Sequence, residues 1–411
     1  MRRKATVFGV AVLVAAVSAS SVMAASLVAI PKVTNRQDST VKVGVYPRGI
    51  TPDGRFVGGT AGLGFGSGGE NTGFVYDATT GVIGHIVAGG YQACVDGIGY
   101  WTDGTTTKVV IEGDNGGWQS MNAWDTASNW DGTAQWAKIR RTNTHAYGDN
   151  GGLNRMAGTS NSSTGLLHGV FQTNTQTIYI DAFNGTGLGA LDVKSTTNET
   201  TMNGISNAGK AVGVRGGRCY YVGPYVGGTT PANGYIAAAP DGTDAGSLYD
   251  IADDGSIMGG YGHVTGKTGW YPFVYDGTTS FELPGLSSGS GYATNGVVYS
   301  ISPNGDYAVG MDYTKGYELA VMWDLRDMNN IVATDLTAFA AANGILGPFD
   351  GNLRRATAIG INAEGNPVIA GVGVASSLEA SGYTGFVLTI PEPATMGLLV
   401  LGLPLMFWRR R

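Results

Sequence analysis

Charged and metal-binding side chains are scarce in this sequence. Asp, Glu, Lys and Arg make up 14% of its 411 residues, and it has four histidines and two cysteines. No basic cluster interrupts the body of the chain, which argues against nucleic acid as a partner. The histidines show no spacing typical of a zinc site, so we expect neither a metal nor a cofactor. They are His85, His145, His168 and His263.

The two cysteines, Cys94 and Cys219, are too few for the disulfide framework of a small secreted domain. The sequence leaves open whether they form one disulfide or remain two buried thiols. Neither has a neighbouring histidine that would activate a thiolate, so a cysteine nucleophile is poorly supported. The fold must therefore rest on a hydrophobic core, which a chain of this length can supply.

Glycine and apolar residues are abundant instead. There are 68 glycines, more than twice the usual share of about 7%. Hydrophobic residues reach 43% and aromatic residues 10%, which is too apolar for a disordered chain and is typical of a β protein with many tight turns. Residues 25–390 alone carry 19 basic and 30 acidic residues, a net charge of −11. This balance argues against adhesion to anionic lipid.

The body of the chain contains an internal repeat. In five segments an isoleucine stands four residues before a glycine, and an apolar stretch then ends at a second glycine. Two weaker copies, starting at 98 and 147, fill the gaps, which gives seven units spaced by 46 to 60 residues. The five clear segments are Ile50–Gly58, Ile205–Gly213, Ile251–Gly259, Ile301–Gly310 and Ile361–Gly371.

Each unit predicts about four short strands. Asp-Gly and Asn-Gly pairs, such as Asp53-Gly54 and Asn304-Gly305, favour a tight hairpin in which both central residues have positive φ. A further apolar, aromatic strand ending in Asp follows, as in residues 73–77, 271–276 and 319–324. Four strands in a period near fifty residues are typical of a propeller blade.

We therefore predict an all-β fold, a β-propeller of seven blades over residues 26–389. A parallel β-helix and a pair of β-sandwiches are the structural alternatives. Residues 26–45 and 372–389 should meet, so that one terminal strand completes the last blade. Residues 334–343 predict a short helix, with Thr334 or Asp335 as its N-cap and Gly344 at its end.

The two ends of the chain predict export. Residues 1–24 combine a basic start, an apolar stretch and small residues before Ala24, which is typical of a signal peptide removed by signal peptidase. At the other end, Pro391, Glu392 and Pro393 precede an apolar run over 396–408, where we expect a short transmembrane helix held by Arg409, Arg410 and Arg411. A plain membrane anchor without processing is the alternative for this tail.

Residues 390–411 resemble a PEP-CTERM sorting signal, and the repeats resemble the HAF-type repeats of extracellular bacterial proteins. The first resemblance implies that an exosortase recognises and removes the tail. It also implies transient anchoring in the inner membrane, followed by residence at the cell surface or in an exopolysaccharide matrix. The second resemblance implies propeller blades.

Four tryptophans are the main candidate binding residues. Trp118, Trp124, Trp130 and Trp136 recur every six residues, and exposed aromatic rings can stack on sugars. The alternative is that Trp124 and Trp136 belong to the core. Calcium at Asp53, Asp253 and Asp254 is a weaker hypothesis, because turn geometry alone explains Asp before Gly.

The sequence thus favours a non-catalytic exported surface or matrix protein. A lectin-like propeller that binds carbohydrate is the first alternative. A propeller glycosidase or lyase with carboxylates at the axis is the second, although the sequence contains no recognisable catalytic set.

Overall fold

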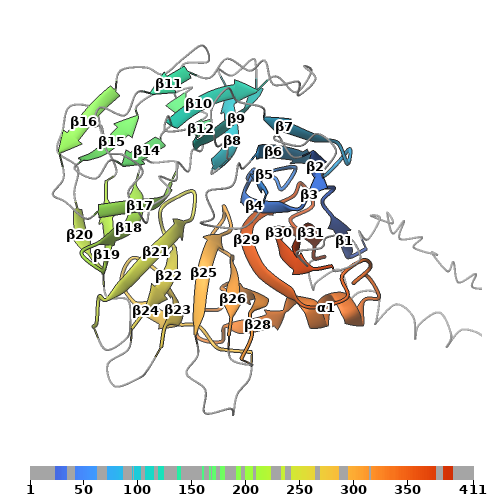
Figure 1. Ribbon diagram of the computed structural model, residues 1–411. Helices are drawn as coiled ribbons and strands as arrows, with labels where there is room; N and C mark the ends of the chain where they lie inside the picture. The colour runs from blue at the N-terminus through green and yellow to red at the C-terminus, as the bar shows by residue number, and fades with distance from the viewer. Residues whose placement is uncertain are drawn as a thin grey trace, which may run out of the picture. The chain divides into compact units, whose positions relative to one another are not determined.

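The computed structural model contains one compact unit, residues 25–390 (Figure 1). Residues 1–24 and 391–411 belong to a second unit. The predicted signal peptide and sorting signal lie outside the described structure except for Ala24, Ile390 and Pro391. In the described part no helix is long and apolar enough to span a membrane. The described residues are 24–34, 42–62, 72–86, 95, 97–102, 107–114, 119–124, 137–139, 160–161, 166–167, 169–172, 176–180, 191–195, 200–206, 210–223, 233–236, 242–263, 269–286, 295–313, 316–375 and 383–391.

Antiparallel sheets make up nearly all of this structure. Within the described ranges, six sheets have four strands and one has three, and in each the strands lie side by side in chain order, apart from one terminal strand. Blade 1 contains β4 (Val45–Ile50), β5 (Phe56–Ala61), β6 (Thr72–Asp77) and β7 (Ile83–Ile86). Blade 2 contains β8 (Gly97–Thr102), β9 (Thr107–Asp114), β10 (Gln119–Trp124) and β11 (Ala137–Ile139). Blade 3 contains β14 (Gly169–Gln172), β15 (Gln176–Ile180) and β16 (Leu191–Ser195).

The second half of the chain repeats this pattern more regularly. Blade 4 contains β17 (Thr200–Ile205), β18 (Ala211–Arg215), β19 (Arg218–Val222) and β20 (Asn233–Tyr235). Blade 5 contains β21 (Gly246–Ile251), β22 (Met258–Gly262), β23 (Tyr271–Tyr275) and β24 (Ser280–Glu282). Blade 6 contains β25 (Gly296–Ile301), β26 (Tyr307–Asp312), β27 (Leu319–Asp324) and β28 (Val332–Asp335). Blade 7 contains β29 (Leu353–Ile361), β30 (Pro367–Val374), β31 (Tyr383–Thr389) and β1 (Ser26–Ala29).

Two small pairs complete the strands: β2 (Val33–Thr34) with β3 (Lys42–Val43), and β12 (Ser160–Asn161) with β13 (Leu166–Leu167).

The first strand of a blade packs against the strands of the blade before it. Thus β8 contacts β4 and β5, β21 contacts β17 to β19, β25 contacts β21 to β23, and β29 contacts β25 to β27. The series closes on itself, because β4 of blade 1 contacts β29, β30 and β31 of blade 7. Successive four-stranded sheets joined in this cyclic order form a β-propeller, as the repeats predict.

The N-terminal strand closes the last blade. β1 pairs antiparallel with β31, with Ser26 opposite Thr389 and Ala29 opposite Phe386 (Figure 1). The backbone N–H of Ile30 extends the contact by donating to the carbonyl of Gly385 (2.8 Å). The prediction that the two ends of the body meet in one blade is therefore confirmed.

The isoleucine of the repeat ends the first strand in blades 1, 4, 5, 6 and 7. In blade 1 the next residues form a turn closed by the Gly54 N–H, which donates to the carbonyl of Thr51 (2.8 Å). Gly54 has φ +75°, and the equivalent Gly255, Gly305 and Gly365 have similar values. In blade 2 the first strand continues past Ile98 to Thr102. The copy starting at 147 lies outside the described residues.

The two-residue hairpin predicted from the Asp-Gly pair is wrong. Residues 51–55 separate β4 from β5, so the connection is longer than a pair of central turn residues. The reason is the Asp53 side chain, whose carboxylate accepts from Thr51 Oγ1 (2.6 Å) and from the Arg55 N–H (3.1 Å). These bonds stabilise a wider turn, in which Gly54 has the positive φ.

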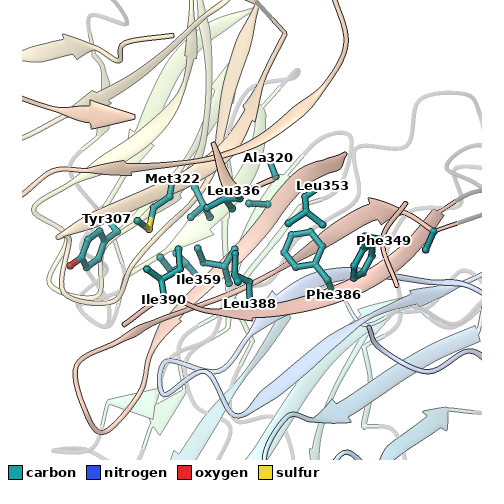
Figure 2. Packing of buried hydrophobic residues seen from close by; sticks show 14 residues of the cluster. Tyr307, Ala320, Met322, Leu336, Phe349, Leu353, Ile359, Phe386, Leu388 and Ile390 are labelled. Carbon is teal, nitrogen blue, oxygen red and sulfur yellow. The ribbon is translucent and has the colours of Figure 1, made fainter. Parts of the chain in front are cut away.

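Third strands supply the largest core side chains. Phe74, Phe273, Trp323 and Phe386 are the largest fully buried residues of the described structure, and they belong to β6, β23, β27 and β31. This confirms the predicted aromatic strands. Between blades 6 and 7, Met322 and Leu336 face Leu353 and Phe386 in one apolar cluster (Figure 2).

One helix decorates this cluster. α1 (Leu336–Ala342) begins after Asp335, whose carboxylate accepts from the N–H groups of Thr337 (2.9 Å) and Ala338 (3.0 Å). Gly344 follows the helix with φ +67°. The predicted helix, its N-cap and its end are therefore confirmed.

Candidate functional site

A cavity of about 120 Å³ lies where the first strands of the blades converge. Residues of β4, β8, β17, β21, β25 and β29 line it, so it marks the propeller axis. Its wall is mixed. Arg48, Asn203, Asp250 and Tyr299 contribute polar groups, and the isoleucines that end the strands contribute apolar surface.

A β-bulge recurs in the first strand of five blades. In β4 the pairing with β5 shifts between Pro47 and Gly49, which leaves Arg48 as the extra residue. Bulges re-aim a side chain out of the regular alternation, and in each of these strands one extra residue lines the axial cavity. These residues are Arg48, Asn203, Tyr249, Tyr299 and Thr357. A second shift in β29 leaves Arg354 as a further extra residue, which does not line the cavity.

A glycine on the second strand faces the bulge. A Cβ at Gly310 would lie 1.9 Å from the carbonyl oxygen of Val297, and one at Gly260 would lie 2.0 Å from that of Ser247. Gly59 and Gly371 show the same close approach to Tyr46 and Arg355. The second glycine of the sequence repeat, or the glycine after it, therefore exists because the bulge brings two backbones together.

Several of the axial side chains join neighbouring blades. Asp250 of blade 5 accepts from Ser300 Oγ (2.7 Å) and from the Ile301 N–H (2.9 Å) of blade 6. Asn203 of blade 4 donates from Nδ2 to the carbonyl of Leu248 in blade 5 (2.6 Å). These bonds join blade 4 to blade 5 and blade 5 to blade 6 near the axis.

Blades 6, 7 and 1 meet in a charged network. Arg355 donates from Nε to Glu318 Oε2 (2.9 Å) and from Nη1 to the Tyr46 hydroxyl (3.1 Å), and a second bond joins Nη2 to Glu318 Oε1. Burial acts to lower the pKa of Arg355, but its hydrogen bonds to Glu318, together with charge interactions with Tyr46, Tyr299 and Glu318, raise it overall. Burial raises the pKa of Tyr46 and of Tyr299. Arg355 therefore stays charged and the two tyrosines stay neutral at neutral pH.

The sequence repeat contained a signal for the axial residues. Arg48, Asn203, Tyr249 and Tyr299 each stand two residues before the isoleucine of their repeat unit. Regular strand alternation places that position on the same face as the isoleucine, so no special role could be assigned to it. The bulge makes it different, and a bulge has no clear sequence pattern of its own.

The four predicted tryptophans are not brought together in the described structure. Trp124 is the last residue of β10, where its Cα lies opposite that of Val109. Trp118, Trp130 and Trp136 lie outside the described residues.

The predicted cysteine and histidine positions show no shared site in the described structure. Cys219 is a buried free thiol, and burial raises its pKa. His263 is exposed beside the Tyr261 ring, and the backbone of His85 belongs to β7. Cys94, His145 and His168 lie outside the described residues.

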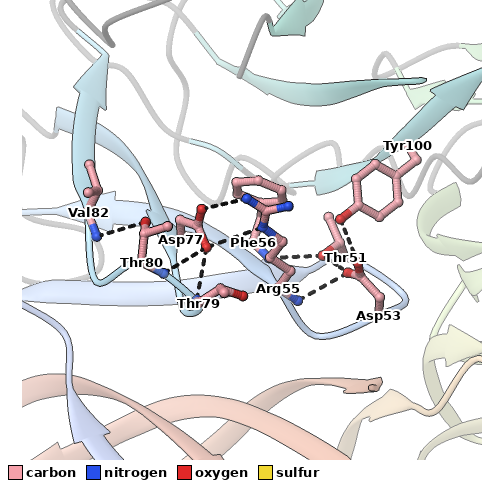
Figure 3. A network of polar contacts seen from close by, with 9 residues as sticks. All are labelled: Thr51, Asp53, Arg55, Phe56, Asp77, Thr79, Thr80, Val82 and Tyr100. Carbon is pink, nitrogen blue, oxygen red and sulfur yellow. Dashed lines mark hydrogen bonds and ion pairs between the residues drawn. The ribbon is translucent and has the colours of Figure 1, made fainter. Parts of the chain in front are cut away.

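The acidic turns are explained by their own hydrogen bonds. Asp53 also accepts from the Tyr100 hydroxyl (2.7 Å), and Asp77 pairs with Arg55 (3.0 Å) and accepts from the Thr79 N–H (2.9 Å) (Figure 3). No group of three His, Cys, Asp or Glu side chains that could hold a metal ion occurs among the described residues. The turn geometry thus accounts for Asp53 without calcium.

No family model matches the chain, and no curated protein sequence matches it. Among solved structures, the β-propeller domain of the Trilobed protease from Pyrococcus furiosus is similar, with 13% identity and a TM-score of 0.47 over 84% of this chain and 93% of that one. TolB from Acinetobacter baumannii has 14% identity and a TM-score of 0.40 over 66% of this chain. The match spans 62% of TolB, less than two thirds of its length.

A putative 6-phosphogluconolactonase from Bacteroides uniformis is also similar, with 12% identity and a TM-score of 0.44 over 76% of this chain and 95% of that one. These likenesses concern the course of the chain alone. The assignment of a propeller rests on the sheets and contacts described above.

Proposed function

We propose that this chain is an exported, non-catalytic propeller of the cell surface or extracellular matrix, sorted through its C-terminal tail. The observation that carries the proposal is the position of the tail. β31 ends at Thr389, the buried Ile390 donates its N–H to the carbonyl of Pro367 (3.0 Å), and Pro391-Glu392-Pro393 follows at once. A processing enzyme acting beyond Pro393 would leave every blade intact.

The bonds of two carboxylates favour a binding or structural role over turnover. Asp250, which lines the axial cavity, accepts from two groups of the next blade, and both oxygens of Glu318, in the network that joins blades 6, 7 and 1, accept from Arg355. A glycosidase needs two acids free to act on a sugar, one as acid and one as nucleophile or base. The alternative of a glycosidase or lyase predicts turnover on a glycan panel, which we do not expect.

Intact-mass analysis tests the proposal. The protein is recovered from the cell-surface and culture fractions of its native host. We expect a mass that lacks residues 1–24 and the tail beyond about Pro393. A mass that still includes residues 396–411 would mean a retained membrane anchor, and the sorting proposal would be wrong.

A further inference from the structure

The two ends of the blades differ in chemistry. At one end lie the repeat turns, with acidic residues such as Asp53, Asp254 and Asp276; we call it the turn end. At the other end the second strand of each blade leads into the third; we call it the aromatic end. The turn ends of blades 5 and 6 lie next to each other, and so do their aromatic ends. At the turn end the Asp253 N–H donates to the carbonyl of Pro303 (3.0 Å), and at the aromatic end the Gly296 N–H donates to the carbonyl of Trp270 (3.1 Å).

Exposed aromatic residues gather at the aromatic end. Of the large hydrophobic side chains that are exposed in the described structure, all the aromatic ones lie at this end of their blades. Of the three exposed valines, Val82 and Val332 lie at the turn end, and Val28 lies within β1 opposite Val387. The aromatic residues are Tyr235, Trp270, Tyr313, Tyr317 and Tyr383, and each exposes between 39% and 46% of its surface.

Asn295 bonds to the backbones of two residues of this group. The Asn295 side-chain oxygen accepts from the Trp270 N–H (3.0 Å), and its backbone carbonyl accepts from the Tyr313 N–H (2.7 Å). The Gly316 N–H then donates to the carbonyl of Tyr313 (3.0 Å), in the turn that presents Tyr317. The backbones of the two neighbouring blades are thus fixed to each other where they present their rings.

A row of rings runs from Trp270 to the axis. The Tyr261 ring lies 5.3 Å from that of Trp270 and is tilted by 33°, and the Tyr249 ring lies 6.1 Å from Tyr261. Tyr299 follows at 5.6 Å with its edge toward Tyr249. Tyr249 and Tyr299 line the axial cavity, so the row connects the exposed rim to the cavity.

We infer that the aromatic end of blades 5 and 6 binds a neutral polysaccharide. The C–H face of a pyranose ring packs on the electron-rich face of an aromatic ring, and Tyr hydroxyls and Asn amides can bond its hydroxyl groups. Among the described residues of these blades, the large hydrophobic side chains exposed at this end are all aromatic, unlike the aliphatic lining of a groove for an apolar helix. The net charge of −11 over residues 25–390 disfavours an anionic polymer.

This inference deepens the proposed function, on which it rests for access to extracellular glycans. Its test uses the full chain in an ethylene-glycol-ether detergent, which has no sugar head group. Native affinity electrophoresis is run through gels containing a mixed-linkage β-glucan, a galactomannan or dextran, with alginate as the charged comparison. We expect retardation by at least one neutral polymer and none by alginate.

Matched variants locate the site. Trp270→Ala/Tyr313→Ala should weaken retention about tenfold or more, because aromatic anchors dominate such contacts. Val82→Ala/Val332→Ala removes comparable exposed side chains from the turn end and should leave retention unchanged. Trp270→Phe/Tyr313→Phe retains the rings and should bind, which separates a binding effect from misfolding.

Three outcomes would overturn the inference: no retardation by any neutral polymer, equal retardation of the alanine and parent proteins, or equal loss in both alanine variants. These outcomes would leave the sorting proposal untouched, because the intact mass from the host tests that proposal without any glycan.

Discussion

At the scale of the residue, the packing around the propeller axis requires glycines that lie in strands rather than in turns. Gly310 leaves room for the carbonyl of Val297, and this close approach lets the bulge turn Tyr299 toward the cavity. A glycine with positive φ is needed for a different reason, because a residue with a Cβ would be strained in that backbone conformation. Gly316, at φ +82° with open space around its Cα, is of that second kind.

Substituting each glycine by alanine separates the two effects. We expect Gly310→Ala to lower the free energy of unfolding by more than about 2 kcal/mol, because a methyl group cannot share the space of a backbone oxygen. Gly316→Ala should cost about 1 kcal/mol, from its φ alone. Urea denaturation of both variants measures the difference. Equal costs would show that the close approach at Gly310 relaxes freely.

The network at Arg355 is also testable by matched variants. Arg355→Ala removes bonds between three blades, and the half-buried Glu318 and Tyr46 hydroxyl both lose their bonds to Arg355. We therefore expect the free energy of unfolding to fall by about 2 kcal/mol. Arg326 also pairs with a carboxylate, but Asp324 is only two residues away. Arg326→Ala should therefore cost less than about 1 kcal/mol in the same denaturation experiment. A larger loss for Arg326 would contradict the role given to the inter-blade network.

At the scale of the element, local patterns predicted the strands and the positions of the turns, but not the length of the turns. These patterns are local. An isoleucine ends the first strand before a turn, and aromatic residues of the third strands fill the core. The bulges escaped prediction, because they arise from how two strands and the next blade fit together. The exposed aromatic residues escaped for the same reason. Trp270 and Tyr313 lie 43 positions apart in the sequence, and only the packing of two blades brings them to one asparagine.

The cap of α1 provides a test at this scale. Asp335→Ala should lower the free energy of unfolding by about 1 kcal/mol, because two N–H groups lose their acceptor. Asp335→Asn should retain most of the stability, since asparagine caps a helix equally well. Thermal unfolding followed by circular dichroism compares the two. Equal losses would mean that the charge, rather than the cap, stabilises this element.

At the scale of the whole molecule, an aspartate with a lowered pKa recurs at the turn end of several blades. Asp77, Asp276 and Asp324 follow or end the third strands of blades 1, 5 and 6, and the pKa of each carboxyl is below its ordinary value of 3.8. Burial acts to raise the pKa of Asp77, but bonds from Arg55 and from backbone N–H groups outweigh it. At Asp276 the backbone N–H of Thr279 is the largest cause, and at Asp324 it is the Arg326 side chain.

These aspartates predict that the propeller loses stability in acid. A carboxyl whose pKa is lower in the folded state stabilises the fold above about pH 4, and its contribution disappears as the pH falls through the folded pKa. We expect the melting temperature to fall between pH 4 and pH 2, and to fall less in the triple variant Asp77→Asn/Asp276→Asn/Asp324→Asn. Differential scanning calorimetry at pH 7 and along this range measures both. Parallel curves for the two proteins would contradict the assignment.

The pairing of β1 with β31 has a kinetic consequence. It joins residues from opposite ends of the folded unit, so it is among the contacts of highest sequence separation in the molecule. Contacts of this kind form late, because the entropy of closing a long loop opposes them until the intervening blades are in place. During synthesis from the N-terminus the first strand emerges hundreds of residues before its partner. The ring therefore stays open while the chain is being made, and the arrival of the last strand sets the moment at which folding is complete.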